Sequence, residues 1–291
     1  MNSSSTDPHE AKALARRPVG WVAPGPRPRG ADGRPGLVPA ADEHLSYLTG
    51  DWRIFQLQDG HRWSLDDFVT AWVALDEARR HGGVARFLDL GCGIGSVLMM
   101  VAWGLPNARG LGVEAQARSH GLAERSLAWN GADGRCRAKL GDFRDEEGAL
   151  ANEGPFDLIT GTPPYIPLGH GIVSDKPQRG PCCFETRGGI EDYAKVAARL
   201  LATGGVFVTC AGARGDAERG DNAARDAGLA IVRRVDVVPR EGKQTLMWVF
   251  VMEPAGTTRT PTPTERFAVR GIDGKLTAEM HRARADMGLP P

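Results

Sequence analysis

The sequence predicts an α/β fold in which a mostly parallel sheet of seven strands carries an antiparallel hairpin at one edge and helices on both faces. From Ala85 onward, apolar runs of strand length alternate with segments whose apolar residues have helical spacing. Such alternation is typical of parallel strands joined by helical crossovers. The last two apolar runs are separated only by "PREGKQ", which is too short for a parallel crossover.

The predicted elements follow one another in a regular order. Five strand-like runs come first: ARFLDL, ARGLGVE, CRAKLGD, FDLITG and GGVFVTCAG. Segments with helical spacing lie between them: SVLMMVAW, QARSHGLAERSLAWN and IEDYAKVAARLL. The hairpin at the edge of the sheet would consist of LAIVRRVDVV and TLMWVFVM.

Composition divides the chain into four regions. Residues 1–44 are rich in Pro, Gly and Arg and have no apolar period, which predicts a disordered arm. Residues 45–83 predict a cap made of a strand or hairpin and a helix that begins at Ser64. The main domain would cover 84–254, and 255–291 would be a C-terminal extension with a short strand, a turn and a helix.

Charge and composition exclude several classes of protein. The 36 basic residues equal the 36 acidic ones, so the overall field favours neither nucleic acid nor an anionic membrane. No apolar run reaches the ~20 residues of a membrane helix, and Asp7 and Glu10 make the beginning too acidic for a targeting peptide. The five cysteines show neither a CxxC pair nor zinc spacing. We therefore expect a cytoplasmic protein without a metal site.

A glycine-rich turn and an acidic strand end predict a nucleotide-like ligand. Gly91, Gly93 and Gly95 directly follow the first strand of the main domain, and Asp89 precedes them. Glycine suits a turn with positive φ and lets a ligand lie against the backbone. Glu114 closes the next strand, where a carboxylate can accept both hydroxyls of a ribose. A solvated carboxylate at a strand end is the alternative.

A third acidic residue follows the same plan. Asp142 ends the next strand and is followed by Phe143. The carboxylate could accept an adenine amino group while the aromatic ring covers the base. Carboxyl ends of parallel strands meet at one edge, so the three acidic groups would surround one crevice. No lysine follows the glycines, so a phosphate ligand is not expected there.

From Ala85 to Glu253 the chain resembles the class I S-adenosylmethionine-dependent methyltransferases with their Rossmann-like sheet. This resemblance implies that S-adenosyl-L-methionine is the cofactor and that Asp89 and the glycine turn bind it at its methionine part. It also implies that Glu114 holds the ribose and that Asp142 with Phe143 holds the adenine. The antiparallel hairpin at the edge of the sheet is a further feature of that family.

The segment Thr162, Pro163, Pro164 and Tyr165 resembles the motif of exocyclic-amine methyltransferases, usually Asn or Asp, Pro, Pro, then Tyr or Phe. The prolines fix φ and keep the strand end rigid. The Pro163 carbonyl could accept an N–H of the target amine, and Tyr165 could stack on the flat target for about 1–3 kcal/mol. The alternative is a Pro-Pro turn with a core tyrosine.

Thr162 departs from the motif. A threonine hydroxyl is one atom shorter than an asparagine amide and must turn its own proton away before it can accept one. A bridging water, a different nucleophile or reduced activity are therefore alternatives to direct acceptance from an adenine amine.

The residues before the main domain indicate a subfamily. "FQLQDGHRWSLDDFVTAW" resembles a segment of the bacterial tRNA-Val adenine N(6)-methyltransferases that helps to cover the cofactor, which implies that Arg62 and Asp66 line the pocket. Alternatively, Ser64 and Asp66 only cap a helix. Farther along, Arg179 and Arg187 could meet substrate phosphates, and Glu185 could orient one of these arginines. Alternatively, the three charges pair with one another in a loop.

Three functions remain open from the sequence. The first is methylation of the exocyclic amine of adenine in tRNA or another structured RNA, which would have to present the base out of its stack. The balanced charge argues mildly against RNA. The second is methylation of a protein glutamine or a small molecule by the same fold. The third is a non-catalytic scaffold that binds S-adenosylmethionine.

Overall fold

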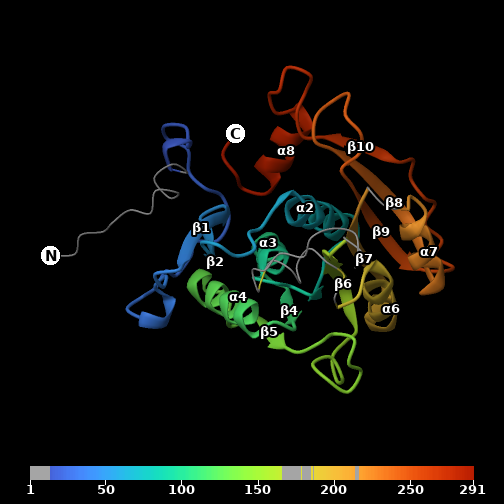
Figure 1. The fold of residues 1–291 in the computed structure, drawn as a ribbon, viewed down its shortest axis with the longest axis horizontal. Helices are drawn as coiled ribbons and strands as arrows, with labels where there is room; N and C mark the ends of the chain where they lie inside the picture. Colours follow the sequence, from blue (N-terminus) through green and yellow to red (C-terminus); the bar gives the residue numbers. More distant parts are fainter. Residues whose placement is uncertain (1–13, 166–177, 179–184, 186, 214–215) are drawn as a thin grey trace.

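The computed structural model describes residues 14–165, 178, 185, 187–213 and 216–291. Within these residues one large sheet has the strand order β10-β8-β9-β7-β6-β3-β4-β5, and a separate pair is formed by β1 and β2. Helices cover both faces of the large sheet (Figure 1). The predicted α/β fold with a Rossmann-like, mostly parallel sheet is confirmed.

The large sheet is parallel except for one of its described strands. Its parallel strands are β3 (Arg86–Leu90), β4 (Arg109–Glu114), β5 (Cys136–Leu140), β6 (Phe156–Gly161), β7 (Leu201–Gly212), β8 (Leu229–Val238) and β10 (Glu265–Ala268). β9 (Met247–Pro254) pairs antiparallel with both β7 and β8. The predicted hairpin therefore exists as the pair of β8 and β9.

The described sheet has one strand more than the seven predicted. The additional strand is β10, which comes from the C-terminal extension and pairs parallel with β8. It is four residues long, and only Phe267 and Ala268 bury their side chains in it. A run this short carries too little periodicity to be counted as a strand of the sheet from sequence alone.

Each face of the sheet has its own hydrophobic core. One core contains side chains of α2 (Leu65–Arg80), α3 (Ser96–Gly104), α4 (Ala117–Asn130) and α8 (Ala278–Asp286). The other contains side chains of α6 (Ile190–Leu200) and α7 (Arg219–Asp226). Neighbouring strand residues such as Phe87 and Leu88 belong to opposite cores because side chains alternate along a strand.

The predicted cap consists of the hairpin of β1 (Glu43–Thr49) and β2 (Trp52–Leu57), followed by α2. Helix α2 begins after Ser64, as predicted, and the Ser64 backbone N–H donates to Asp67 Oδ2 at 3.0 Å. This is one half of a capping box. The hairpin packs on α4, and α2 packs on α3, so the cap shares the core of the main domain.

The described part of the expected disordered arm lies against the body of the protein. Arg17 Nη1 donates to Asp51 Oδ1 at 2.8 Å, and Arg125 donates to the backbone carbonyls of Gly36 and Val38. Leu37 in η1 (Pro35–Leu37) is buried. Residues within 14–44 thus contact partners that are far away in sequence, which the composition of this segment does not indicate; residues 1–13 lie outside the described residues.

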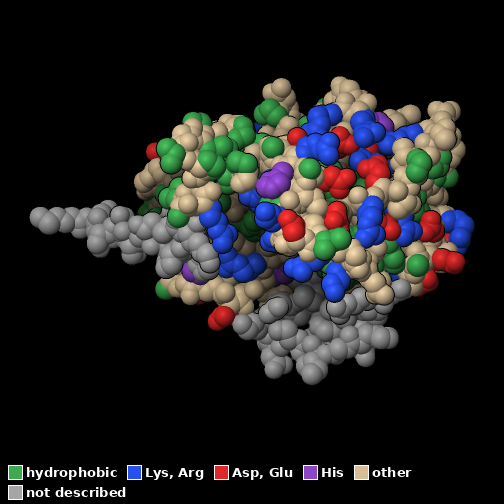
Figure 2. Space-filling model, turned by 90° about the horizontal axis from the view of Figure 1, so that it is seen from above, with side chains coloured by type: hydrophobic (Ala, Val, Ile, Leu, Met, Phe, Trp, Pro, Cys, Tyr) green, Lys and Arg blue, Asp and Glu red, His purple; other side chains and the backbone are tan. Residues whose placement is uncertain are grey.

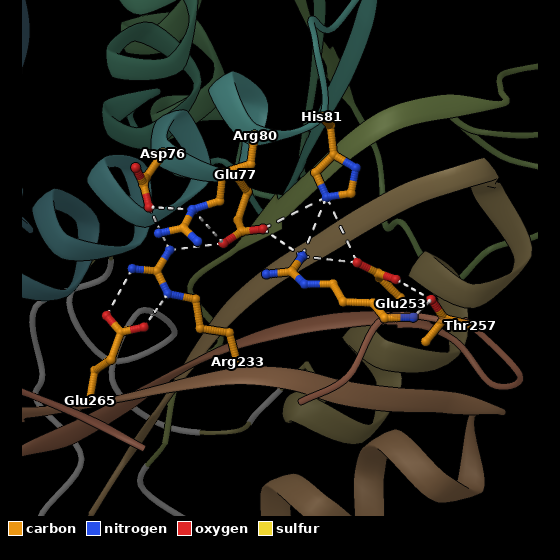
Figure 3. Close-up of polar contacts among 9 residues, drawn as sticks. Asp76, Glu77, Arg80, His81, Arg233, Glu253, Thr257 and Glu265 are labelled. Carbon is orange, nitrogen blue, oxygen red and sulfur yellow. Dashed lines mark hydrogen bonds and ion pairs between the residues drawn. The ribbon is translucent and has the colours of Figure 1, made fainter. Parts of the chain in front are cut away.

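A buried ion-pair network joins the C-terminal extension to the sheet and to α2 (Figure 3). Glu77 accepts from Arg233 Nη1 at 2.8 Å and from Arg259 Nη1 at 2.7 Å. Arg233, only 4% exposed, also donates to Glu265 through Nε and Nη2 and to Asp76. Buried charges of this kind need several partners to offset their desolvation. The extension thereby gains a structural role that the sequence left unassigned.

Candidate functional site

A cavity of about 620 Å³ opens at the carboxyl ends of β3, β4, β5 and β6. Its volume falls in the range of small-molecule sites, about 300–1,000 Å³. Its described lining comes from the glycine turn, the ends of β4 and β6, the residues after β5, the segment before α2, and single residues at 187 and 193. This is the edge of a parallel α/β sheet at which ligands ordinarily bind.

The glycine turn lies against the cavity. Gly91 and Gly93 both have φ of 58° and line it. A Cβ atom at Gly93 would meet no other atom within 4 Å, so its backbone faces open space, whereas a Cβ at Gly91 would collide with the Tyr193 hydroxyl. Gly95, at the start of α3, lies outside the lining and packs on Ala123. The turn therefore offers backbone to a ligand mainly at Gly91 and Gly93.

Asp89 lies behind this turn and not in the cavity lining. Its carboxylate accepts from the Thr160 hydroxyl at 2.8 Å and from the Leu98 N–H at 3.0 Å. Burial raises the pKa of Asp89 to about 7. The direct cofactor contact predicted for Asp89 is thus not what the geometry offers, because its side chain is used to join β3 to β6 and α3.

Glu114 lies at the end of β4, in the cavity wall. Its Oε2 accepts from the Gly93 N–H at 3.0 Å and its Oε1 from the Gln116 N–H at 2.7 Å. Burial raises the pKa of Glu114, whereas the two backbone hydrogen bonds lower it. A carboxylate has about four acceptor positions, and the two backbone N–H groups and the Gln116 side chain use three of them, so one position is free for a ligand hydroxyl and a second hydroxyl could replace Gln116.

Asp142 and Phe143 line the cavity after β5. Arg144 holds the Asp142 carboxylate through Nε at 2.9 Å and Nη2 at 2.6 Å, and these hydrogen bonds keep the pKa of Asp142 below its usual value. The Phe143 ring meets the Tyr193 ring edge to face, with centroids 4.5 Å apart. Together they present an acceptor beside an aromatic wall.

The segment from Thr162 to Tyr165 lines the cavity after β6. The Tyr165 ring is 42% exposed, so it is not a core tyrosine. It lies against Gly212 at the end of β7, where a Cβ atom would come within 2.6 Å of Tyr165 Cδ2. Thr162 Oγ1 lies 3.5 Å from Asp67 Oδ1.

The segment before α2 also reaches the cavity. Arg62 and Asp66 line it, as the resemblance implied, and Arg62 Nη2 donates to Ser46 Oγ at 3.3 Å. The Ser64 hydroxyl contacts Asp66 Oδ1, while the carboxylate that caps the start of α2 is that of Asp67. Gln178 fixes the segment from the other side, since its Oε1 accepts from the His61 N–H at 2.9 Å.

Of the three predicted substrate residues, the two that the structure describes have different surroundings. Arg187 lines the cavity, and its charge favours the ionised forms of Glu114, whose pKa burial nevertheless raises, and of Asp142, whose pKa is lowered mainly by Arg144. Glu185 instead forms an ion pair with Arg219 of α7, and Arg219 also pairs with Glu191. Arg179 lies outside the described residues.

Asp67 is the main residue that the sequence reasoning missed. It lines the cavity, is 5% exposed and has its pKa raised to about 8 by burial, with the neighbouring Asp66 charge adding to the rise. The only signal was the second carboxylate in "SLDD", which also suits helix capping. Tyr193 and Ser96 are further lining residues without a sequence signal.

Comparisons with known proteins support the fold. The chain is 18% identical to a predicted O-methyltransferase from Agrobacterium tumefaciens, with a TM-score of 0.54 over 77% of this chain and 98% of that chain. The fold is that of class I S-adenosylmethionine-dependent methyltransferases. A T. thermophilus 16S rRNA N2 G1207 methyltransferase in complex with AdoMet and guanosine gives a TM-score of 0.51 at 20% identity, covering 73% of this chain and 50% of that one.

Curated relatives match shorter parts. A release factor glutamine methyltransferase of Rhodospirillum rubrum is 39% identical over 82 residues, 28% of this chain and 24% of the relative. A 4-amino-L-phenylalanine/4-methylamino-L-phenylalanine methyltransferase of Streptomyces pristinaespiralis is 34% identical over 145 residues, 47% of this chain and 48% of the relative. The chain thus spans less than half of the length of these two relatives. No family model matches the sequence.

The cavity fits the cofactor that this fold implies. Its described lining carries five carboxylates (Asp59, Asp66, Asp67, Glu114 and Asp142) against the guanidinium groups of Arg62 and Arg187. An acidic lining suits S-adenosylmethionine, which bears a sulfonium and an amino group. The open backbone at Gly93 and the spare acceptors of Glu114 and Asp142 suit its methionine, ribose and adenine parts. No described helix is long and apolar enough to cross a membrane.

Proposed function

We propose that this protein is an S-adenosylmethionine-dependent N-methyltransferase whose target is a planar nitrogen, most specifically the exocyclic amine of adenine in tRNA or another structured RNA. The observation that carries the proposal is one shared cavity: the glycine turn and Glu114 form part of its wall, and Thr162 to Tyr165 form another. Cofactor and target would therefore meet without a change of domain arrangement.

The residues of the chain divide into two groups. Gly91, Gly93, Glu114 and Asp142 with Phe143 would hold the cofactor. When bound, S-adenosylmethionine would supply a methyl group on a positively charged sulfur, and the substrate nitrogen would take that methyl and lose one proton. The rigid backbone at positions 163 and 164 aims the carbonyl of Pro163, which would accept one N–H of the target amine.

The exposed ring of Tyr165 would stack on the target. One side of the ring packs against Gly212 in β7, and a base would stack on the exposed side. Arg62 and Arg187 would supply positive charge beside it for a phosphate. On the right-hand part of the face drawn in Figure 2, basic side chains are mixed with acidic ones, which offers a phosphate backbone no continuous basic surface there.

A protein glutamine is the second candidate target. Several relatives carry the name release factor glutamine methyltransferase, at 39% identity over 82 residues and 35% over 107 residues. An amide nitrogen is planar like an exocyclic amine, so the same acceptors and the same ring would suit it. The cofactor would be held in the same way in both cases.

The test is transfer of radiolabelled methyl from S-adenosylmethionine to total tRNA and, separately, to total protein. Label recovered as N(6)-methyladenosine after nucleoside analysis would support the RNA proposal. Label in glutamine of a protein would replace it by the second candidate. Cofactor binding without transfer to either pool would instead favour a non-catalytic scaffold.

A further inference from the structure

Two threonine–aspartate pairs lie at the end of β6. Thr160 belongs to the strand, and Thr162 is the first residue after Gly161, where the strand ends. Thr160 Oγ1 donates to Asp89 Oδ1 at 2.8 Å, and Thr162 Oγ1 lies 3.5 Å from Asp67 Oδ1. The first pair is buried, whereas Thr162 and Asp67 of the second pair both line the cavity.

The Asp67 carboxylate cannot turn freely. Its Oδ2 accepts from the Ser64 backbone N–H at 3.0 Å, which fixes the capping box at the start of α2. The Oδ1 atom lies 3.5 Å from Thr162 Oγ1, and the Ser96 side chain also hydrogen-bonds this carboxylate. The separation of 3.5 Å is at the outer limit of a hydrogen bond, and such contacts commonly tighten when a substrate complex forms.

We propose that Asp67 is a positioning residue for Thr162: it accepts the hydrogen bond of the Thr162 hydroxyl, so that the Thr162 oxygen presents its lone pairs to an N–H of the substrate amine. This rests on the proposed N-methyltransferase function. It also accounts for threonine at the motif position, because the hydroxyl proton has an acceptor behind it and is turned away from the substrate. Thr162 and the Pro163 carbonyl would then be the two acceptors on the target nitrogen.

The ionised form of Asp67 is required for this arrangement, and with a pKa of about 8 it becomes the main form at neutral pH only when a nearby positive charge favours it. If Asp67 were protonated, the proton would lie on Oδ1, since Oδ2 already accepts from Ser64. Oδ1 would then donate to Thr162, and the hydroxyl proton of Thr162 would point into the cavity. The charged groups that act on Asp67 are Asp66 of the same helix and Asp89 of β3, and both disfavour its ionisation. A bound sulfonium would favour it.

The first test is independent of turnover. The pKa of Asp67 is measured by NMR titration of its carboxyl carbon in the wild-type protein and in Thr162→Val. Loss of a donor to the carboxylate raises the pKa, so we expect a higher value in the variant. An unchanged pKa would overturn the proposal, whether or not the protein is an active methyltransferase.

The second test is a double-mutant cycle on methyl transfer. Asp67→Asn keeps the shape, but its oxygen must face the Ser64 N–H, so its NH₂ group would donate to Thr162 and reverse the hydrogen bond. We expect kcat to fall about 10- to 100-fold, the range of one hydrogen bond to a charged group, with cofactor affinity unchanged within about twofold. In a Thr162→Asn background, whose amide oxygen reaches the substrate directly, the same change should cost less than about threefold.

Asp192→Asn is the matched control, because Asp192 occupies the same third helical position in α6 and accepts from the Gly189 N–H at 3.2 Å. It removes a capping carboxylate outside the cavity lining and should leave kcat unchanged. Equal losses from Asp67→Asn in the wild-type and Thr162→Asn backgrounds would overturn the proposal, since the role would then be structural. Absence of transfer by a wild-type protein that binds cofactor would refute the proposed function, and the titration would still decide whether Asp67 holds Thr162.

Discussion

The division of the cavity into a cofactor part and a target part predicts different effects for Glu114→Ala and Tyr165→Ala. Both Glu114 oxygens accept a backbone N–H, at 3.0 and 2.7 Å, and the Gln116 side chain bonds the same carboxylate, so two ribose hydroxyls would take the free acceptor position and that of Gln116. A hydrogen bond to a charged group contributes about 1.5–3 kcal/mol, so two ribose hydroxyls correspond to about 3–6 kcal/mol. In the Glu114→Ala variant, water can accept part of the hydrogen bonds of the ribose hydroxyls. We therefore expect the loss of cofactor binding free energy to be about 3 kcal/mol, the lower end of this range.

A loss of about 3 kcal/mol raises the dissociation constant of S-adenosylmethionine about 100-fold. Isothermal titration calorimetry with S-adenosylmethionine or its demethylated product measures this directly. Glu114→Gln should also weaken binding, since its NH₂ group must face either the Gly93 or the Gln116 N–H. The two backbone N–H groups at Gly93 and Gln116 need two acceptor oxygens, which Glu114 has and a glutamine at this position lacks.

Tyr165→Ala is the control, because its ring lies on Gly212 at the end of β7 and not on the glycine turn. We expect nearly unchanged cofactor affinity and loss of methyl transfer. The reasoning would be refuted if Glu114→Ala bound cofactor within about threefold of the wild-type protein, or if both variants lost affinity equally.

Three further predictions concern the seat of the tyrosine, the pH dependence of stability and the buried network. Gly212→Ala should raise KM for the methyl acceptor without changing cofactor affinity, because the new Cβ would displace the Tyr165 ring. Gly121→Ala is the control, since its Cβ meets no atom within 4 Å, and it should change neither the KM for the acceptor nor the KM for the cofactor in steady-state kinetics. The pKa of Asp67 is raised from 3.8 to about 8, so the folded state holds a proton that the unfolded state releases; this stabilisation is complete below the unfolded value and is lost as the pH rises toward 8. Urea titrations of Asp67→Asn should therefore show a shallower decline of unfolding free energy across this pH range, and an equal decline in both proteins would contradict the raised pKa. Arg233→Ala should lower the unfolding free energy by about 3 kcal/mol, because the buried Glu77 carboxylate would lose its hydrogen bond from Arg233; a change below about 1 kcal/mol in urea unfolding would show that the network contributes little.

Much of the site could be predicted because its chemistry lies at the ends of regular elements. Gly93, Glu114, Asp142 and Tyr165 each follow a strand that has a clear apolar run, and parallel strands bring their carboxyl ends to one edge. Contacts that depend on distant partners were missed. Glu185, for example, pairs with Arg219, which no local pattern indicates.

The sequence by itself determined the order of strands and helices, the glycine turn and the acidic strand ends, since these depend on local periodicity and on residue type. Only the tertiary structure decided which side chains turn toward the cavity. It directed Asp89 to Thr160 and Leu98, away from a ligand, and it placed Asp67 beside Thr162 although 95 positions separate them in the chain. The physical reason is that burial and pairing of a polar group depend on all elements packed around it, whereas a sequence pattern reports only its own element.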